Sequence, residues 1–248
     1  MLPTVVEPRQ ISFNRVLLKV SGEGFCRPGG FGFDIEEVRS MAAQIRAVAS
    51  IGVELAVVIG GGNILRGAQV KAMGVNPATA DYMGMLATVM NGLALQDALD
   101  KLGVECRVLS AIGVHQVCEP FVRLRAIRHL EKGRVIILAG GTGNPFFTTD
   151  TAAALRATEI GADALLKATK VDGVYSADPV LDKKATRYKH LSYDQVRERD
   201  LRVMDRTAIT LCMENQLPII VFNLKVEGNI SRVVKGEDIG TLINSSEG

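Results

Sequence analysis

Short apolar segments alternate with helical patterns along most of the chain. Between the apolar segments, hydrophobic residues recur at helical spacing, as they do from Val38 to Val48, just after Asp34 and Glu37 form a capping-box pattern. The apolar segments are near-continuous, which is typical of strands in a parallel sheet covered by helices on both faces. The pattern therefore predicts an α/β protein, a three-layer α/β/α sandwich with a mainly parallel central sheet. The predicted strands are 16–20, 53–59, 104–109, 135–138, 163–167 and 218–223.

Three of the predicted strands run directly into glycines. The segments are VLLKVSGEG (16–24), LAVVIGGGNILRG (55–67) and LAGGTGNPFFTTD (138–150). Glycines permit tight turns whose backbone N–H groups stay open to an anion, and the third loop leads into an Ala-rich helix capped by Thr149 or Asp150. One such cluster is equally compatible with an ordinary strand-to-helix turn. Because the carboxyl ends of parallel strands share one edge, three clusters predict a single phosphate-binding crevice there.

A long helical pattern covers 76–102 and carries two apolar stripes. A surface this wide is expected to be buried on two sides. One interpretation is a core helix, and the other is that part of the stripe packs on a second subunit. The stripes are Met83, Leu86, Met90 and Leu93, and Ala94, Ala98 and Leu102.

The remaining segments complete the domain. Residues 1–13 contain two prolines and no periodicity, which predicts a flexible N-terminal tail before a single domain over 14–248. A helix is expected over 120–132, with Pro120 in its first turn, and 182–190 is a charged segment for which no strand is predicted.

Composition narrows the class of protein. The 248 residues include 29 Lys plus Arg against 27 Asp plus Glu, so no basic surplus favours nucleic-acid binding. The four cysteines lie far apart and the three histidines are scattered, so no zinc site is expected; Cys106 is expected to be buried. Reduced thiols and the lack of a leader or a long apolar segment favour a cytoplasmic protein without a membrane segment.

Two basic residues stand beside the glycine segments. The chain has neither the G-x-x-x-x-G-K-[ST] pattern nor the protein-kinase signatures, and it lacks G-x-S-x-G and H-E-x-x-H, so phosphate chemistry on another scaffold remains. Lys19 lies inside an apolar strand next to the Ser21–Gly22 turn, and Arg66 follows the triple glycine. Phosphoryl transfer needs such cations around the moving group, although a solvent-facing lysine and an exposed arginine are the alternatives.

Five segments together resemble the bacterial uridylate (UMP) kinases of the amino-acid kinase superfamily. The resemblance extends from about Arg15 to Ile243. It implies transfer of the γ-phosphoryl group of MgATP to UMP, in a homohexamer activated by GTP and inhibited by UTP, as a step of pyrimidine nucleotide biosynthesis. The segments are LLKVSGE, VVIGGGNILRG, DYMGMLATVMNGLA, GTGNPFFTTD and LKATKVDGVYSADP.

The resemblance also assigns residues to the two substrates. It places Lys19, Val20, Ser21, Gly22, Gly62, Arg66, Thr169, Tyr175 and Asp178 at ATP. It places Gly61, Asp81, Thr142, Gly143, Asn144, Pro145, Phe146, Phe147, Thr148 and Thr149 at UMP. The segment tied to GTP activation in the family corresponds to Arg27, Pro28, Gly29, Gly30, Phe31 and Gly32, although its amino-acid sequence differs from the one more common in the family.

Four of the polar residues have alternative interpretations. Asp81 near a helix start suits ribose hydroxyls but also suits a helix cap, and Tyr175 offers a ring to a base but also suits packing. Asp150 and Asp205 are candidates for organising the lysine or Mg²⁺, and capping fits both equally well. The alternatives for the whole protein are a sibling kinase acting on CMP, acetylglutamate or carbamate, and a non-catalytic nucleotide-binding scaffold.

Overall fold

A computed structural model of the chain describes residues 13–65, 70, 74–179 and 181–245. Within these residues, nine strands form one sheet in the order β4-β3-β5-β2-β1-β6-β8-β9-β7. All hydrogen-bonded neighbours are parallel except β8 and β9. The strands are β1 (Arg15–Val20), β2 (Glu54–Ile59), β3 (Cys106–Ser110), β4 (Glu119–Pro120), β5 (Val135–Ala139), β6 (Ala164–Thr169), β7 (His190–Ser192), β8 (Ile219–Asn223) and β9 (Thr241–Asn244).

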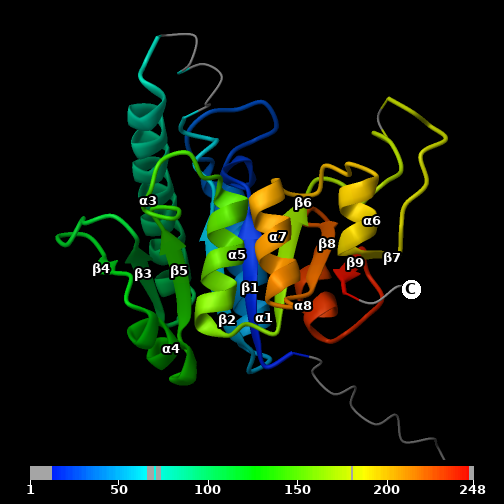
Figure 1. Cartoon of the computed structure of the whole chain (residues 1–248). Helices are drawn as coiled ribbons and strands as arrows, with labels where there is room; N and C mark the ends of the chain where they lie inside the picture. Colours follow the sequence, from blue (N-terminus) through cyan, green and yellow to red (C-terminus); the bar gives the residue numbers. More distant parts are fainter. Residues whose placement is uncertain (1–12, 66–69, 71–73, 180, 246–248) are drawn as a thin grey trace, which may run out of the picture.

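Helices cover both faces of this sheet (Figure 1). Helices α1, α3 and α8 pack on one face, and α4, α5, α6 and α7 pack on the other. The predicted three-layer α/β/α sandwich is therefore confirmed. The helices are η1 (Gly22–Phe25), α1 (Ile35–Ala49), α3 (Pro77–Lys101), α4 (Arg123–Glu131), α5 (Thr149–Ile160), α6 (Tyr193–Glu198), α7 (Arg206–Glu214) and α8 (Asn229–Val234).

Alternate side chains of strand β1 pack against the two helix layers. Val16, Leu18 and Val20 pack with the α1, α3 and α8 layer, whereas Leu17 packs with the layer that contains α5. Successive side chains of a strand point to opposite faces, so Lys19 lies on the same side as Leu17, beneath α5. The buried charged residue of this strand, Lys19, is thus directed toward a helix terminus.

The structure corrects several predicted boundaries. Glu119–Pro120 is the short edge strand β4, and α4 begins only at Arg123. An edge strand tolerates proline because its missing N–H faces no partner. The N-cap of α5 is Thr148, whose hydroxyl accepts hydrogen bonds from the N–H groups of Asp150 and Thr151, so neither Thr149 nor Asp150 caps this helix.

The ends of the domain also differ from the sequence-based prediction. Strand β7 begins at His190, the last residue of the charged segment for which no strand was predicted, and it pairs with β9. Phe13, assigned to the tail, packs against the core, and the rest of the predicted tail lies outside the described residues. Among the helices that the structure describes, none is both long and apolar enough to cross a membrane.

Candidate active site

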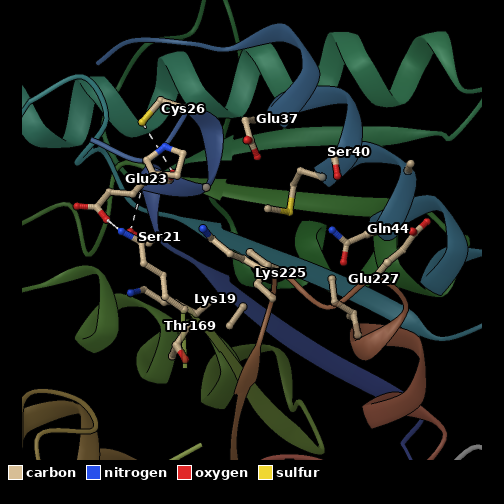
Figure 2. A pocket seen from close by; sticks show the side chains of 18 of the residues that line it. Lys19, Ser21, Glu23, Cys26, Glu37, Ser40, Gln44, Thr169, Lys225 and Glu227 are labelled. Carbon is tan, nitrogen blue, oxygen red and sulfur yellow. Dashed lines mark hydrogen bonds and ion pairs between the residues drawn. The ribbon is translucent and has the colours of Figure 1, made fainter. Parts of the chain in front are cut away.

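The candidate site lies at the carboxyl edge of the parallel strands, where the loops after β1, β2, β5 and β6 gather (Figure 1). A cavity of about 1150 Å³ opens there. Lys19, Ser21 and Thr169 line one part of it, and residues of α1, of the segment after β1 and of the segment between β8 and α8 line other parts (Figure 2). Of the three glycine loops predicted to share one crevice, the loop after β1 lines this cavity, whereas the described residues of the loops after β2 and β5 contribute none of its lining residues.

Two lysines on adjacent strands share one aspartate. Lys19 Nζ lies 2.7 Å from Asp150 Oδ1, and Lys167 Nζ lies 2.7 Å from Asp150 Oδ2. The three side chains are only 11%, 13% and 16% exposed. Lys19 and Lys167 face each other in the parallel register of β1 and β6, so both ammonium groups reach the first turn of α5 on the same face of the sheet.

The charges of this cluster shift the pKa values of Asp150 and Lys167. Burial alone would raise the pKa of Asp150, but the two ammonium groups outweigh it and hold that pKa below its ordinary value. Burial lowers the pKa of Lys167, and the neighbouring Lys19 charge lowers it further, against the attraction of Asp150. Lys167 also donates to the carbonyl of Val203. One carboxylate between two ammonium groups leaves a positive surplus at the cavity wall, which suits phosphate.

The structure separates the roles of the two candidate aspartates. Asp150 contacts both lysines and is the residue that organises them. Asp205 caps α7 through the N–H of Ala208, and its other oxygen accepts hydrogen bonds from the hydroxyls of Thr148 (2.5 Å) and Thr151 (2.9 Å). Asp205 therefore joins the start of α7 to the start of α5, and its contacts support a capping role.

Glycine is required where the first two loops meet. A Cβ on Gly22 would lie 2.5 Å from the carbonyl oxygen of Gly60, and a Cβ on Gly61 would lie 2.8 Å from that of Gly84 in α3. The N–H of Gly60 donates to the carbonyl of Val20 at 2.9 Å. The two predicted phosphate loops thus pack directly on each other and on α3. By contrast, a Cβ on Gly62 would meet no atom within 4 Å, so its backbone faces open space.

The loop between β5 and α5 is bound to α3 through Asp81. Oδ2 of Asp81 accepts a hydrogen bond from the N–H of Phe146 at 2.7 Å. Phe146 has a φ of 71°, which is uncommon for a residue with a side chain, and its ring is 77% exposed. Asn76 caps α3 and Asp81 lies in the second turn, so the capping alternative for Asp81 is wrong. Asp81 holds the backbone of this loop in place, and the exposed Phe146 side chain is accessible to a ligand.

Apart from Gly61 in the loop after β2 and Thr149 at the start of α5, the other residues predicted at UMP belong to the loop between β5 and α5. Its first turn is closed by Thr142, whose hydroxyl donates to the carbonyl of Asn144 at 3.0 Å and accepts from its N–H at 3.1 Å. Gly143 has a φ of 85°, and Phe147 is half-exposed. Gly143, Pro145 and Thr149 complete the continuous segment from Thr142 to the first turn of α5.

The residues predicted at the adenosine lie apart from one another. Thr169 lines the cavity at the end of β6. Tyr175 and Asp178 are not among the lining residues; Tyr175 donates its hydroxyl hydrogen bond to Asp172 at 2.6 Å and pairs with Arg187 in an antiparallel bridge. The structure therefore brings only Thr169 of these three to the cavity wall.

The segment predicted to respond to GTP contributes to the same cavity. Arg27, Pro28 and Gly29 line it, whereas Phe31 is 71% exposed. Gly32 donates its N–H to the carbonyl of Asn63 at 2.7 Å, which joins this segment to the loop after β2. Gly30 completes the segment, and its N–H donates to the carbonyl of Arg27. The predicted Arg66 lies outside the described residues.

Lys167 is a site residue that the sequence-based prediction missed. A signal was present, because ALLKA (164–168) repeats the pattern of VLLKV (16–20), an isolated lysine in the last half of an apolar strand. The register of β1 and β6 places the two lysines side by side. Only that register, which connects residues 148 positions apart, reveals that both lysines contact one carboxylate.

These contacts define what the site can do. Two cations held by one aspartate, beside loops of open backbone N–H groups, can bind the phosphates of a nucleotide and stabilise charge on a phosphoryl group during transfer. Direct phosphoryl transfer requires no covalent nucleophile on the protein. The site is that of a phosphoryl-transferring enzyme.

Comparison with known proteins gives the family. Residues 14–223 match the amino acid kinase family, so the chain belongs to it. Among solved structures, UMP kinase from Bacillus anthracis is 39% identical with a TM-score of 0.93, covering 95% of this chain and 97% of its own.

Two further solved structures show the same likeness. UMP kinase from Ureaplasma parvum is 35% identical with a TM-score of 0.89, covering 94% of this chain and 99% of its own. Uridylate kinase from Archaeoglobus fulgidus is 32% identical with a TM-score of 0.71, covering 92% and 99%. Each likeness extends over nearly the whole of both chains.

Proposed function

We propose that this protein is a UMP kinase, which transfers the γ-phosphoryl group of ATP to UMP and releases ADP and UDP. The observation that carries the proposal is the Lys19–Asp150–Lys167 cluster at the meeting point of the glycine loops. The likeness to UMP kinases over nearly the whole chain names the acceptor. Phosphoryl transfer is the reaction to which the cluster and the loops are both suited.

Lys19 and Lys167 act on the phosphoryl group in transit. Both ammonium groups are held by Asp150 and are largely buried, so they need no rearrangement when negative charge spreads over the transferred oxygens. Asp150 positions the two lysines and keeps them from repelling each other. Ser21, Gly22 and Gly62 supply backbone donors to the ATP phosphates, and Arg66 is assigned there with them.

The loop between β5 and α5 binds the acceptor. Asp81 holds this loop through Phe146, and its carboxylate retains a second oxygen that can accept a hydrogen bond from a ribose hydroxyl. Phe146 and Phe147 present exposed rings to the base. The N-terminus of α5, capped by Thr148, favours a phosphate at this end of the loop.

Magnesium enters with ATP in this proposal. Mg²⁺ in such enzymes is usually held by substrate phosphates, water and one or two carboxylates. Within the described residues, no group of three or more His, Cys, Asp or Glu side chains forms a metal site, and Asp150 is engaged by two lysines. These residues fit a Mg²⁺ ion that is coordinated mainly by the phosphates of ATP.

Association of several copies is also part of the proposal. Met83, Leu86 and Met90 lie on one stripe of α3 and are 40%, 48% and 49% exposed, although the stripe is apolar. Such a surface is expected to be covered by a second copy. The homohexamer, activation by GTP through Arg27–Gly32 and inhibition by UTP are expected by analogy with the family, as are a place in pyrimidine nucleotide biosynthesis and a cytoplasmic location.

A substrate panel tests the proposed function. The purified protein is incubated with MgATP and, in turn, UMP, CMP, AMP, GMP, acetylglutamate or carbamate, and ADP release is measured. We expect UMP to be converted at least about tenfold faster than any other acceptor, since rejecting a base that leaves buried polar groups unpaired is worth at least about 1.4 kcal/mol. Equal turnover of CMP would show that the acceptor is misassigned, and no turnover at all would favour a nucleotide-binding scaffold.

A further inference from the structure

One face of α3 contacts two of the loops that surround the candidate site, the loop after β5 at two points and the loop after β2 at one. Asp81 accepts from the N–H of Phe146, Thr88 accepts from the N–H of Gly140 at 2.8 Å, and Asn91 donates to the carbonyl of Gly60 at 2.7 Å. Positions 81, 88 and 91 are separated by seven and three residues, so the three side chains lie within one side of the helix. Of these three side chains, those of Thr88 and Asn91 have no role in the chemistry described above.

Thr88 holds the start of the acceptor loop. The side chain is buried, and its hydroxyl donates to the carbonyl of Met85 at 2.6 Å while accepting from Gly140. Gly140 has a φ of 76°, and a Cβ there would lie 2.9 Å from the backbone nitrogen of Ala111. The turn is therefore fixed between α3 on one side and the end of β3 on the other. The N–H of Gly140 would be buried without an acceptor if the hydroxyl were removed.

Asn91 holds the loop after β2 with the help of Asn63. The two amides bond reciprocally, at 2.9 Å and 2.7 Å, and the second amide hydrogen of each reaches a backbone carbonyl, Gly32 for Asn63 and Gly60 for Asn91. Both side chains are almost fully buried. Oδ1 of Asn63 lies 2.6 Å from where a Cβ on Gly22 would stand. The pair therefore sits directly under the two phosphate loops.

We propose that Thr88 and the Asn63–Asn91 pair are positioning residues: Thr88 sets the acceptor loop and the amide pair sets the phosphate loops against α3. None of the three is placed at a substrate, so each acts through the backbone it holds. The inference rests on the proposed function, because the loops that these residues hold are the loops of the proposed active site. Displacing a loop by about 1 Å can cost as much as about 100-fold in rate.

The test for Thr88 uses two substitutions, one that removes the hydroxyl and one that keeps it. Thr88→Val removes the hydroxyl and leaves Gly140 without an acceptor, so KM for UMP is expected to rise about fivefold or more, with KM for ATP within about twofold. Thr88→Ser keeps the hydroxyl and is expected to restore KM for UMP to within about twofold of the wild-type value. Tyr193→Phe is the control, because it removes a buried hydrogen bond to Leu217 on the opposite face of the sheet. It is expected to lower Tm without changing either KM.

The test for the amide pair separates stability from positioning. Asn91→Leu leaves the amide of Asn63 buried with a partner missing and is expected to lower Tm by about 2 to 12 °C. The double variant Asn63→Leu/Asn91→Leu removes both amides and is expected to recover most of that loss, because no side-chain amide remains unpaired. Its kcat/KM for both substrates is nevertheless expected to stay at least about tenfold low, since Gly60 and Gly32 have lost their donors.

The outcomes distinguish this inference from the proposed function. If the wild-type enzyme converts UMP and Thr88→Val changes both KM values equally, or the double variant regains activity along with Tm, the residues are only structural and the inference is wrong. If the wild-type enzyme does not convert UMP, the proposed function fails. Hydrogen exchange then decides the inference: the peptide containing Gly140 should exchange faster in Thr88→Val than in wild type and Thr88→Ser, and equal rates would overturn it.

Discussion

Replacing Asp150 by asparagine tests the contribution of the Lys19–Asp150–Lys167 cluster to stability and its contribution to activity. The substitution keeps the size of the side chain but removes the charge that faces Lys19 and Lys167, each at 2.7 Å. Breaking a buried ion pair by removing one partner costs about 3 to 5 kcal/mol. For a domain of this size each kcal/mol shifts Tm by about 2 to 4 °C, so Tm is expected to fall by about 6 to 20 °C.

The same substitution is expected to lower activity by a distinct route. Without the carboxylate, the two ammonium groups repel each other and leave their positions, and loss of one charge-stabilising group typically costs about 10² to 10³ in kcat. In the double variant Asp150→Asn/Lys167→Met, one of the two uncompensated charges is gone, so much of the lost Tm should return. Activity should not return, because Lys167 is absent and Lys19 is still unsupported.

The pH dependence of stability gives an independent measure of Asp150. The two lysines hold its pKa in the folded state below the ordinary value of about 3.9, so its contribution is complete above that pH and disappears as the pH falls through the folded-state pKa. Asp150→Asn should lose this acid-dependent part of the unfolding free energy.

The measurements are calorimetric Tm, chemical denaturation from pH 2 to 7, and ADP release under saturating substrates. Glu54→Gln is the matched control, because it breaks the ion pair between Glu54 Oε2 and Arg15 Nε, which are 2.5 Å apart. The side chains of Arg15 and Glu54 are 19% and 27% exposed, and neither residue lines the cavity. It should cost about 1 kcal/mol or less and leave kcat unchanged. If Asp150→Asn has the Tm and kcat of wild type, the cluster does not support the lysines and the reasoning is refuted.

Three further predictions concern the remaining parts of the site. Lys19→Ala should lower kcat at least about 100-fold, and a variant that keeps half the activity would make Lys19 an ordinary strand residue. Asp81→Asn should raise KM for UMP about 10- to 150-fold and leave KM for ATP within about twofold; steady-state kinetics with each substrate varied would contradict this if KM for UMP stayed constant. Leu86→Glu/Met90→Glu should shift sedimentation toward smaller species at micromolar concentration, and a monomeric wild-type protein would remove the basis for subunit association.

The sequence was sufficient for the fold because its signals are local. Near-continuous apolar runs identified six of the nine strands described, three of them by the glycines that follow, and the capping residue Asp34 marked a helix start that the structure retains. Boundaries failed where a tertiary contact overrides local preference. Pro120 resembles a first-turn helix residue, yet it lies on β4 because the end of β3 supplies its partner.

The site was predicted less completely because its contacts connect distant segments. Local pattern identifies Lys19 and the glycine loops, but the pairing of Lys167 with Asp150 depends on the register of β1 and β6. The buried pair of Asn63 and Asn91 has no local signature either, since each asparagine alone resembles a loop or helix residue. Such contacts can be recognised only when the strands and α3 are packed together.

Transfer of a labelled γ-phosphoryl group tests the central claim most directly. ATP labelled at the γ-position is mixed with UMP and either wild-type protein or Asp150→Asn, and the nucleotides are separated after a single turnover. The account predicts that the label appears in UDP with the wild-type protein and does so at least about 100-fold more slowly with the variant. Label that appears in inorganic phosphate or stays in ATP with the wild-type protein, or equal rates of UDP labelling for the two proteins, would contradict it.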